Sequence, residues 1–257
     1  DPLSEPLLHA LAESNTQTLT LAPEAGSERL RRLINKGVTE AHVLFAAERA
    51  QAHRFRQLKL YFMLGLPTEE EGDVEAIVEL CEAVAARFSG RVTANVTPFV
   101  PKAHTPFQWA PQLPEQEALE RIMRIKRGSP RGVRVRYHSP FLSVLEGALS
   151  RGDERAGELF LEAFRRGARF DSWEDLVDRK LWRGVFQEAG WDVEGETCRP
   201  RPVDSPLPWA GACPRACSRR SARNTVCATR STVSTGLSPT PACSACMRPP
   251  ARKTSAP

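Results

Sequence analysis

This sequence of 257 residues lacks long apolar runs, and it has few cysteines before residue 198. No apolar run approaches the roughly 20 residues that a membrane-spanning helix needs, and no secretory signal is recognisable, so we expect no membrane partner. Before Cys198 the only cysteine is Cys81, at an apolar helical position, which indicates a buried core thiol. A body with so few thiols is typical of a reducing compartment rather than of a disulfide framework. We therefore predict a cytoplasmic location.

Acidic residues are absent after Asp204, which makes the net charge of +5 misleading. Eight Lys and Arg residues fall in that last stretch, and without them the acidic residues outnumber the basic ones. The body of the chain is therefore mildly acidic, and nucleic acid is not indicated as a partner.

Large apolar residues are missing from the end of the chain as well. Beyond Trp209 there is no Ile, Phe, Tyr or Trp, and the composition is mostly Ala, Arg, Ser, Thr, Pro and Cys. Such a segment buries too little apolar area to offset the entropy of ordering it, so we predict that residues 201–257 are an unstructured, disordered tail. We interpret it as an out-of-frame reading of GC-rich coding sequence, which resequencing would test.

The body alternates between strand-like and helix-like patterns. Apolar and β-branched segments predict strands at 18–22, 58–64, 91–97 and 133–137, with amphipathic helices between them and one before, at 4–14. This alternation predicts an α/β fold with a parallel sheet. The second strand is apolar on both faces at its end, which favours a sheet covered on both sides. Four strands are too few to close a TIM-like barrel, and we expect that a strand precedes the first helix in a longer protein.

The first strand and the helix after it meet at a loop suited to a ligand. Pro23 is expected to end the strand, Gly26 to allow a tight turn, and Ser27 to cap a helix that Gly37 closes. Glu24 then lies beside the C-terminal end of a strand and the start of a helix, where ligands bind in parallel α/β folds. The apolar face of this helix is predicted at Leu30, Leu33 and Ile34.

From Pro140 the pattern changes to helices alone, predicted at 143–150, 154–166 and 181–189. We interpret residues 140–200 as a helical extension whose many aromatic residues pack it onto the sheet. These residues are Phe160, Phe164, Phe170, Trp173, Trp182, Phe186 and Trp191.

If the sheet is parallel, the four loops that follow its strands share one rim. The polar residues of these loops would then surround one cleft: Glu24, the 65–69 turn, Lys102, His104 and His138. Of these, a lone histidine near a rim is more often a hydrogen-bonded loop residue than a catalyst.

Three segments in order carry a resemblance to a known family. They are Ala-Pro-Glu-Ala-Gly-Ser-Glu-Arg-Leu at 22–30, Lys-Leu-Tyr-Phe-Met-Leu-Gly-Leu-Pro-Thr-Glu at 59–69, and Thr-Pro-Phe-Val-Pro-Lys-Ala-His-Thr-Pro-Phe-Gln-Trp at 97–109. They resemble the C-terminal part of the core domain of the radical S-adenosylmethionine (SAM) superfamily. The closest group is the proteins that carry an upstream cobalamin-binding domain. The resemblance covers about residues 1–209 and implies that 1–139 form the C-terminal half of a partial TIM-like barrel.

The resemblance assigns residues after the first strand to SAM. Glu24 matches the position that holds the SAM amino group, and a carboxylate suits an ammonium through charge-assisted hydrogen bonds. Gly26 and Ser27 match the turn beside it. An ordinary carboxylate on a solvated turn is the alternative reading of Glu24.

Two further loops complete the implied cofactor site. Gly65 and Pro67 match the loop that packs near the adenosine, although a plain structural turn explains them as well. Phe99 and Pro101 bound the segment that flanks the adenine in the family.

The cluster-binding motif of the family is missing. Radical SAM enzymes bind a [4Fe–4S] cluster through Cys-x₃-Cys-x₂-Cys, on a loop that would lie upstream of this chain. In the tail, Cys213 and Cys217 have the first spacing, but Arg220 stands where the third cysteine belongs; Cys243 and Cys246 are a second near match. We interpret both as chance spacing and expect no metal site in this chain.

The sequence therefore predicts a fragment of a radical SAM enzyme, with catalytic residues unknown. The parent would cleave SAM reductively to a 5′-deoxyadenosyl radical, using SAM, the cluster and an unknown substrate, with cobalamin as a further cofactor to test. This chain would need the upstream half of the barrel and would be inactive alone. Two alternatives remain open: a non-catalytic α/β-helical module that binds a partner, and a conventional half-barrel enzyme with Glu24, Lys102 and His138 in acid–base roles.

Overall fold

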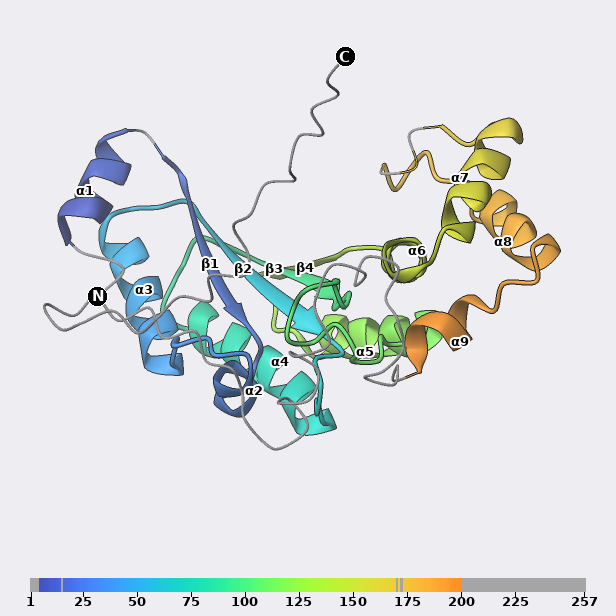
Figure 1. The fold of residues 1–257 in the computed structure, drawn as a ribbon. Helices are drawn as coiled ribbons and strands as arrows, with labels where there is room; N and C mark the ends of the chain where they lie inside the picture. The colour runs from blue at the N-terminus through green and yellow to red at the C-terminus, as the bar shows by residue number, and fades with distance from the viewer. Residues whose placement is uncertain (1–4, 15, 170, 172, 200–257) are drawn as a thin grey trace, which may run out of the picture. The chain divides into compact units, whose positions relative to one another are not determined.

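The computed structural model describes residues 5–14, 16–169, 171 and 173–199. Its centre is a sheet of four parallel strands in the order β1-β2-β3-β4 (Figure 1). The strands are β1 (Thr18–Glu24), β2 (Gln57–Leu64), β3 (Arg91–Pro98) and β4 (Val133–Tyr137). The predicted α/β fold is thus confirmed, and its sequential parallel order is consistent with part of a TIM-like barrel.

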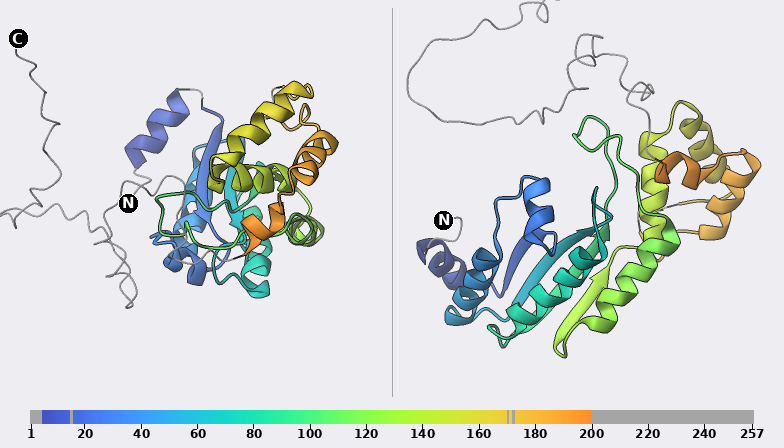
Figure 2. Two further views of the ribbon diagram at one scale, coloured as in Figure 1. Left: turned by 45° about the vertical axis from the view of Figure 1, so that its right-hand side comes forward. Right: turned by 90° about the horizontal axis from the view of Figure 1, so that it is seen from below.

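Helices connect successive strands, and one further helix precedes β1. They are α1 (Glu5–Glu13), α2 (Glu28–Leu33), α3 (Glu40–Ala52), α4 (Glu71–Ala85) and α5 (Glu115–Gly128). Helices α3, α4 and α5 lie along the strands on one side of the sheet (Figure 2). Their apolar faces bury Cys81 completely, and burial raises the pKa of this thiol to about 12, so it is an inert core residue as predicted.

Only one face of the sheet joins this core. Along β2, Leu58, Leu60 and Leu64 are fully buried against the helices, whereas Tyr61 on the opposite face is 41% exposed. The strands therefore alternate apolar and polar residues with the period of two that a half-covered sheet requires. The expectation of a sheet covered on both faces is wrong for the described residues, because helices cover one face only.

The end of β1 differs from the prediction. Pro23 does not end the strand, which continues to Glu24 after a register irregularity between Leu21 and Glu24. Proline is tolerated there because β1 is an edge strand in the described sheet and needs no ladder hydrogen bond from that nitrogen. Glu24 consequently lies within the last pair of the strand, opposite Phe62, rather than on a free loop.

Helix α2 begins as predicted and ends early. Ser27 is its N-cap and accepts a hydrogen bond from Leu30 N at 3.2 Å. Gly37 does not close the helix, which ends at Leu33 because Asn35 takes a left-handed conformation with φ of 56°. Leu33 is 43% exposed, so only part of the predicted apolar face is buried.

The C-terminal region has a core of its own. Helices α6 (Pro140–Arg151), α7 (Arg155–Arg165), α8 (Arg179–Glu188) and α9 (Val193–Cys198) supply it, and α9 is an element that the sequence did not predict. Trp182 and Phe186 pack against Phe141 of α6 rather than against the sheet, while Phe160 and Trp173 are more than half exposed. The expectation that the aromatic residues fasten this region to the sheet is therefore wrong. Phe170 and the predicted disordered tail lie outside the described residues.

Within the described part of the chain, no helix combines the length and the apolar character needed to cross a bilayer.

The one-sided core generates a simple test. Leu60→Ala removes a fully buried side chain and should lower the free energy of unfolding by about 2–5 kcal/mol. Its neighbour Tyr61 points to the uncovered face, so Tyr61→Ala should cost about 1 kcal/mol or less. Urea unfolding followed by circular dichroism would measure both. Equal losses would contradict a sheet with one open face.

Candidate functional site

The three segments predicted to form the site meet at the C-terminal rim of the sheet. Ala25, Leu30 and Leu66 form a small buried cluster, with Met63 and Phe99 packed against it. Ala25 follows β1, Leu66 follows β2 and Phe99 follows β3, so one apolar contact joins all three loops. The loops also share a backbone bond, since Phe99 N donates to Leu64 O at 2.7 Å.

Glu24 occupies the end of β1 in an unusual conformation. Its φ of 69° lies in the left-handed region, which costs a residue with a side chain about 1–3 kcal/mol and occurs most often at functional sites. Its carboxylate accepts a hydrogen bond from Lys36 Nζ at 3.1 Å, and about a quarter of the side chain is exposed. An ammonium thus already sits against the carboxylate that the resemblance assigns to an ammonium.

Gly26 is required by packing rather than by its own backbone angles. A Cβ at this position would lie 2.3 Å from Ile77 N and 2.8 Å from Asp73 O. The loop after β1 therefore rests directly on the backbone of α4, which only glycine permits. The predicted tight turn is replaced by a close approach of two backbones.

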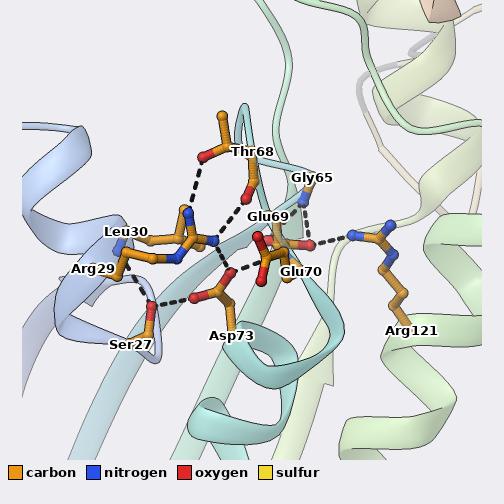
Figure 3. A network of polar contacts seen from close by, with 9 residues as sticks. All are labelled: Ser27, Arg29, Leu30, Gly65, Thr68, Glu69, Glu70, Asp73 and Arg121. Atoms are coloured by element: carbon orange, nitrogen blue, oxygen red, sulfur yellow. Dashed lines mark hydrogen bonds and ion pairs between the residues drawn. The ribbon is translucent and has the colours of Figure 1, made fainter.

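Asp73 holds that approach together. Its carboxylate accepts hydrogen bonds from Ser27 Oγ at 2.5 Å and from Glu70 N at 2.8 Å, and it also pairs with Arg29 (Figure 3). Arg29 extends the network to the second loop by donating to Thr68 O at 2.6 Å. The side chain of Asp73 is only 5% exposed, so these bonds form in a largely dry environment.

A second buried carboxylate fixes the loop after β2. Both carboxylate oxygens of Glu69 lie 3.0 Å from Gly65 N, and Arg121 Nη1 donates to Oε1 at 2.5 Å (Figure 3). Gly65 has a φ of +80°, and a Cβ there would lie 2.4 Å from Leu113 Cγ, so this turn also needs glycine. The predicted turn at Gly65 is thereby given a physical cause.

Burial and pairing move the pKa values of these two acids in opposite directions. Burial raises the pKa of Glu69, and the bonds from Gly65 and Arg121 only partly offset it. Burial also acts to raise the pKa of Asp73, but the bonds from Arg29, Ser27 and Glu70 outweigh it and hold that pKa below its ordinary value.

The remaining predicted residues are placed as follows. Pro67 is half-buried in the loop beside Thr68, Pro101 is buried, and Phe99 meets Phe107 edge-to-face with ring centroids 6.1 Å apart. The hydroxyl of Ser27 accepts a hydrogen bond from Leu30 N and donates one to Asp73, which is a structural role. Whether any of these residues contacts SAM stays a prediction.

The polar residues of the third and fourth loops do not join Glu24. Lys102 pairs with Glu146 of α6, which accounts for its charge. His104 is exposed, and His138 N donates to Val96 O at 3.0 Å. Among the described residues, the acid–base arrangement of Glu24, Lys102 and His138 has no interaction to support it.

A metal site is not present in the described ranges: no three His, Cys, Asp or Glu side chains gather as ligands. The two cysteines described, Cys81 and Cys198, are free thiols, and the pKa of each is raised mainly by burial. The residues described therefore do not fit a [4Fe–4S] cluster.

The residues that sequence reasoning missed are the ones that fasten the loops, namely Arg29, Lys36, Glu69, Asp73 and Arg121. One local signal existed, because Glu70 and Asp73 have the spacing of a capping box at the start of α4. No local pattern indicates that Lys36 pairs with Glu24 or that Arg121 reaches Glu69.

Residues 1–81 match the family model of the Radical SAM superfamily. The matched range includes β1, β2 and most of α4. The chain is also similar to Uncharacterized protein MJ0966 of Methanocaldococcus jannaschii, with 35% identity over 197 residues and 72% of this chain covered. The chain spans 43% of the length of that relative.

The Asp73 network generates the second prediction. Asp73→Asn should lower the free energy of unfolding at pH 7 by about 1.5–3 kcal/mol, because charged hydrogen bonds from Ser27, Arg29 and Glu70 are lost. The lowered pKa means that this contribution is present above the ordinary value of 3.8 and is lost as pH falls through the folded value.

Urea titrations at pH 7 and near pH 3 would measure both effects. Glu75→Gln on the same helix is the matched control, since Glu75 is exposed and has no polar partner among the described residues. A difference between wild type and Asp73→Asn that persisted unchanged at low pH would refute the role of the charge.

Proposed function

We propose that this chain supplies the SAM-binding loops of a radical SAM enzyme, with Glu24 accepting the amino group of SAM. The observation that carries the proposal is the convergence of Ala25, Leu66 and Phe99 in one cluster, because it brings together the three segments that resemble the superfamily. The superfamily match at residues 1–81, which contains the first two of these segments, also supports it.

The donor set suits the cofactor. Lys36 Nζ stands where an external ammonium would bind, 3.1 Å from Glu24 Oε1, so the carboxylate is aimed at a position that a cation occupies. SAM would have to displace this side chain. Gly65 and Pro67 would approach the adenosine, and Phe99 and Pro101 the adenine, on loops that Glu69 and Asp73 hold in place.

The residues described do not fit an iron–sulfur cluster. We propose that its cysteine ligands come from outside residues 1–257 and that the chain does not act alone. Two observations support this: none of the 7 cysteines belongs to a Cys-x₃-Cys-x₂-Cys motif, and the chain spans 43% of its relative. We also propose that a cobalamin-binding domain lies upstream, that the barrel part ends near residue 139, and that the protein is cytoplasmic.

The roles of Glu24 and Lys36 can be separated in a protein that includes the cluster-binding half. Glu24→Gln should weaken SAM binding by about 1.5–3 kcal/mol, because a charge-assisted hydrogen bond is lost. Lys36→Met removes the competing ammonium and should leave SAM binding equal or tighter. Anaerobic calorimetry would measure both affinities.

If the pair were merely structural, the two variants would behave alike. Equal weakening by Glu24→Gln and Lys36→Met would therefore contradict the proposal. Glu40→Gln, which changes an exposed carboxylate at the start of α3, is the control and should leave the affinity unchanged.

The absence of a cluster motif gives a separate prediction for residues 1–257 alone. Anaerobic reconstitution with iron and sulfide should yield no stoichiometric cluster, as judged by visible absorbance and iron content. A stoichiometric cluster whose spectrum responds to SAM would show that the cysteines of the tail act as ligands.

A further inference from the structure

The uncovered face of the sheet is rich in cations. Lys59 of β2, Arg91 of β3, and Arg134 and Arg136 of β4 alternate with the core residues of their strands and therefore share this face. We call these four residues the basic face. All three arginines are exposed, and Lys59 is half-buried.

The strand register places three of these cations in two adjacent rows. Lys59 lies level with Thr93, which lies level with Arg134. In the next row, Tyr61 is level with Asn95 and Asn95 with Arg136. Each row thus carries an arginine on β4 beside a neutral residue of β3, and the first row adds Lys59 on β2, whereas Arg91 lies one row further back, level with Gln57.

The cations of the basic face lack acidic partners within the part of the chain that the structure describes. Among the described residues, the side chains of these four cations make neither an ion pair nor a hydrogen bond. Cations on the loops behave differently, because Lys36 pairs with Glu24. The basic face therefore keeps its charge available for a ligand.

A groove runs along the edge strand β4 and includes two members of the basic face, Arg134 and Arg136, but not Lys59 or Arg91. Its lining is completed by Lys126 of α5, Glu174, Gly132, Val133, Val135 and Tyr137. Three cations face one carboxylate there, so the groove has an excess of positive charge.

The middle of the face is polar and largely preorganised. Gln57 Nε2 donates to Thr93 Oγ1 at 3.1 Å, and Thr93 is only 2% exposed. Asn95 Nδ2 donates to Leu60 O at 3.4 Å, whereas Tyr61 is 41% exposed and presents a free phenol. Thr93 is therefore out of reach of a ligand, whereas Tyr61 can hydrogen-bond an anion that the neighbouring cations attract.

We infer that the basic face binds a small, multiply charged oxyanion carried by the substrate, either a phosphate group or a set of two or more carboxylate groups. That this anion belongs to the substrate rests on the proposed function. The binding of an anion is inferred from the sheet alone. The two rows lie three and five residues before the end of β2, roughly 10–16 Å from the rim that carries Glu24. An anion held there would leave the other end of a small molecule beside the proposed SAM loops.

A small ligand fits these observations better than a nucleic acid. Neighbouring strands lie about 4.8 Å apart and residues two apart on one strand about 6.6 Å, so the backbone positions of Lys59, Arg134 and Arg136 fall within about 12 Å of one another. That span matches one polyvalent group, whereas non-specific nucleic-acid binding requires charge extended along a backbone.

The test is calorimetric titration of the 257-residue chain with inorganic pyrophosphate and, separately, with citrate. The double variant Lys59→Met/Arg136→Met should weaken binding of the preferred probe by at least about tenfold, because two charge-assisted contacts are lost. Preference for pyrophosphate would assign a phosphate group, and preference for citrate a carboxylate group.

Two control proteins keep the outcome clear. Lys180→Met/Arg199→Met removes the same charge from two exposed positions, one in α8 and one just after α9, and should leave binding unchanged. Lys59→Arg/Arg136→Lys keeps the charge and should retain affinity within about threefold. Circular dichroism and urea unfolding of each variant would show that the fold is intact.

Several results would overturn the inference. They are binding of neither probe by the wild type, equal loss in both methionine pairs, and much tighter binding of a short single-stranded oligonucleotide than of either probe. Glu24→Gln should not change the affinity for the anion, so a failure of the SAM proposal would leave this result standing and a failure here would leave SAM binding untouched.

Discussion

The buried carboxylate of Asp73 is the interaction on which the rim depends. It joins the start of α2 to the start of α4, and Arg29 carries the connection onward to the loop at Thr68. Because Gly26 lets the two backbones touch, the carboxylate can be nearly dry and still be fully bonded. Glu69 holds Gly65 in the same way, so two acids fix two neighbouring loops through hydrogen bonds within the protein.

The two faces of the sheet differ in burial and in residue type. One face is buried by helices and carries the apolar core, as Leu60 shows. The other keeps Tyr61, Lys59 and the arginines of β4 available, because no described helix covers it. Ligand-binding groups can vary on such a face without loss of core packing, which is why a barrel-like sheet suits a substrate site.

Reasoning from the sequence succeeded wherever a local pattern was enough. The strands were placed within two residues at each end, and Ser27 was correctly identified as a helix cap. It failed where distant groups decide the outcome: Pro23 continues the strand because β1 lies at an edge, and Trp182 packs within the helical region rather than on the sheet. The site was partly predictable, since parallel strands bring Glu24 and Gly65 to one rim.

The sequence by itself determined the alternation of strands and helices, the buried thiol of Cys81 and the three segments that resemble the radical SAM superfamily. These follow from residue type and spacing, which act over a few positions. Only the tertiary structure decided that Lys36 pairs with Glu24, that Asp73 binds Ser27, and which face of the sheet stays open. Those pairings join residues up to 46 positions apart, and their energies depend on burial and direction that no local pattern encodes.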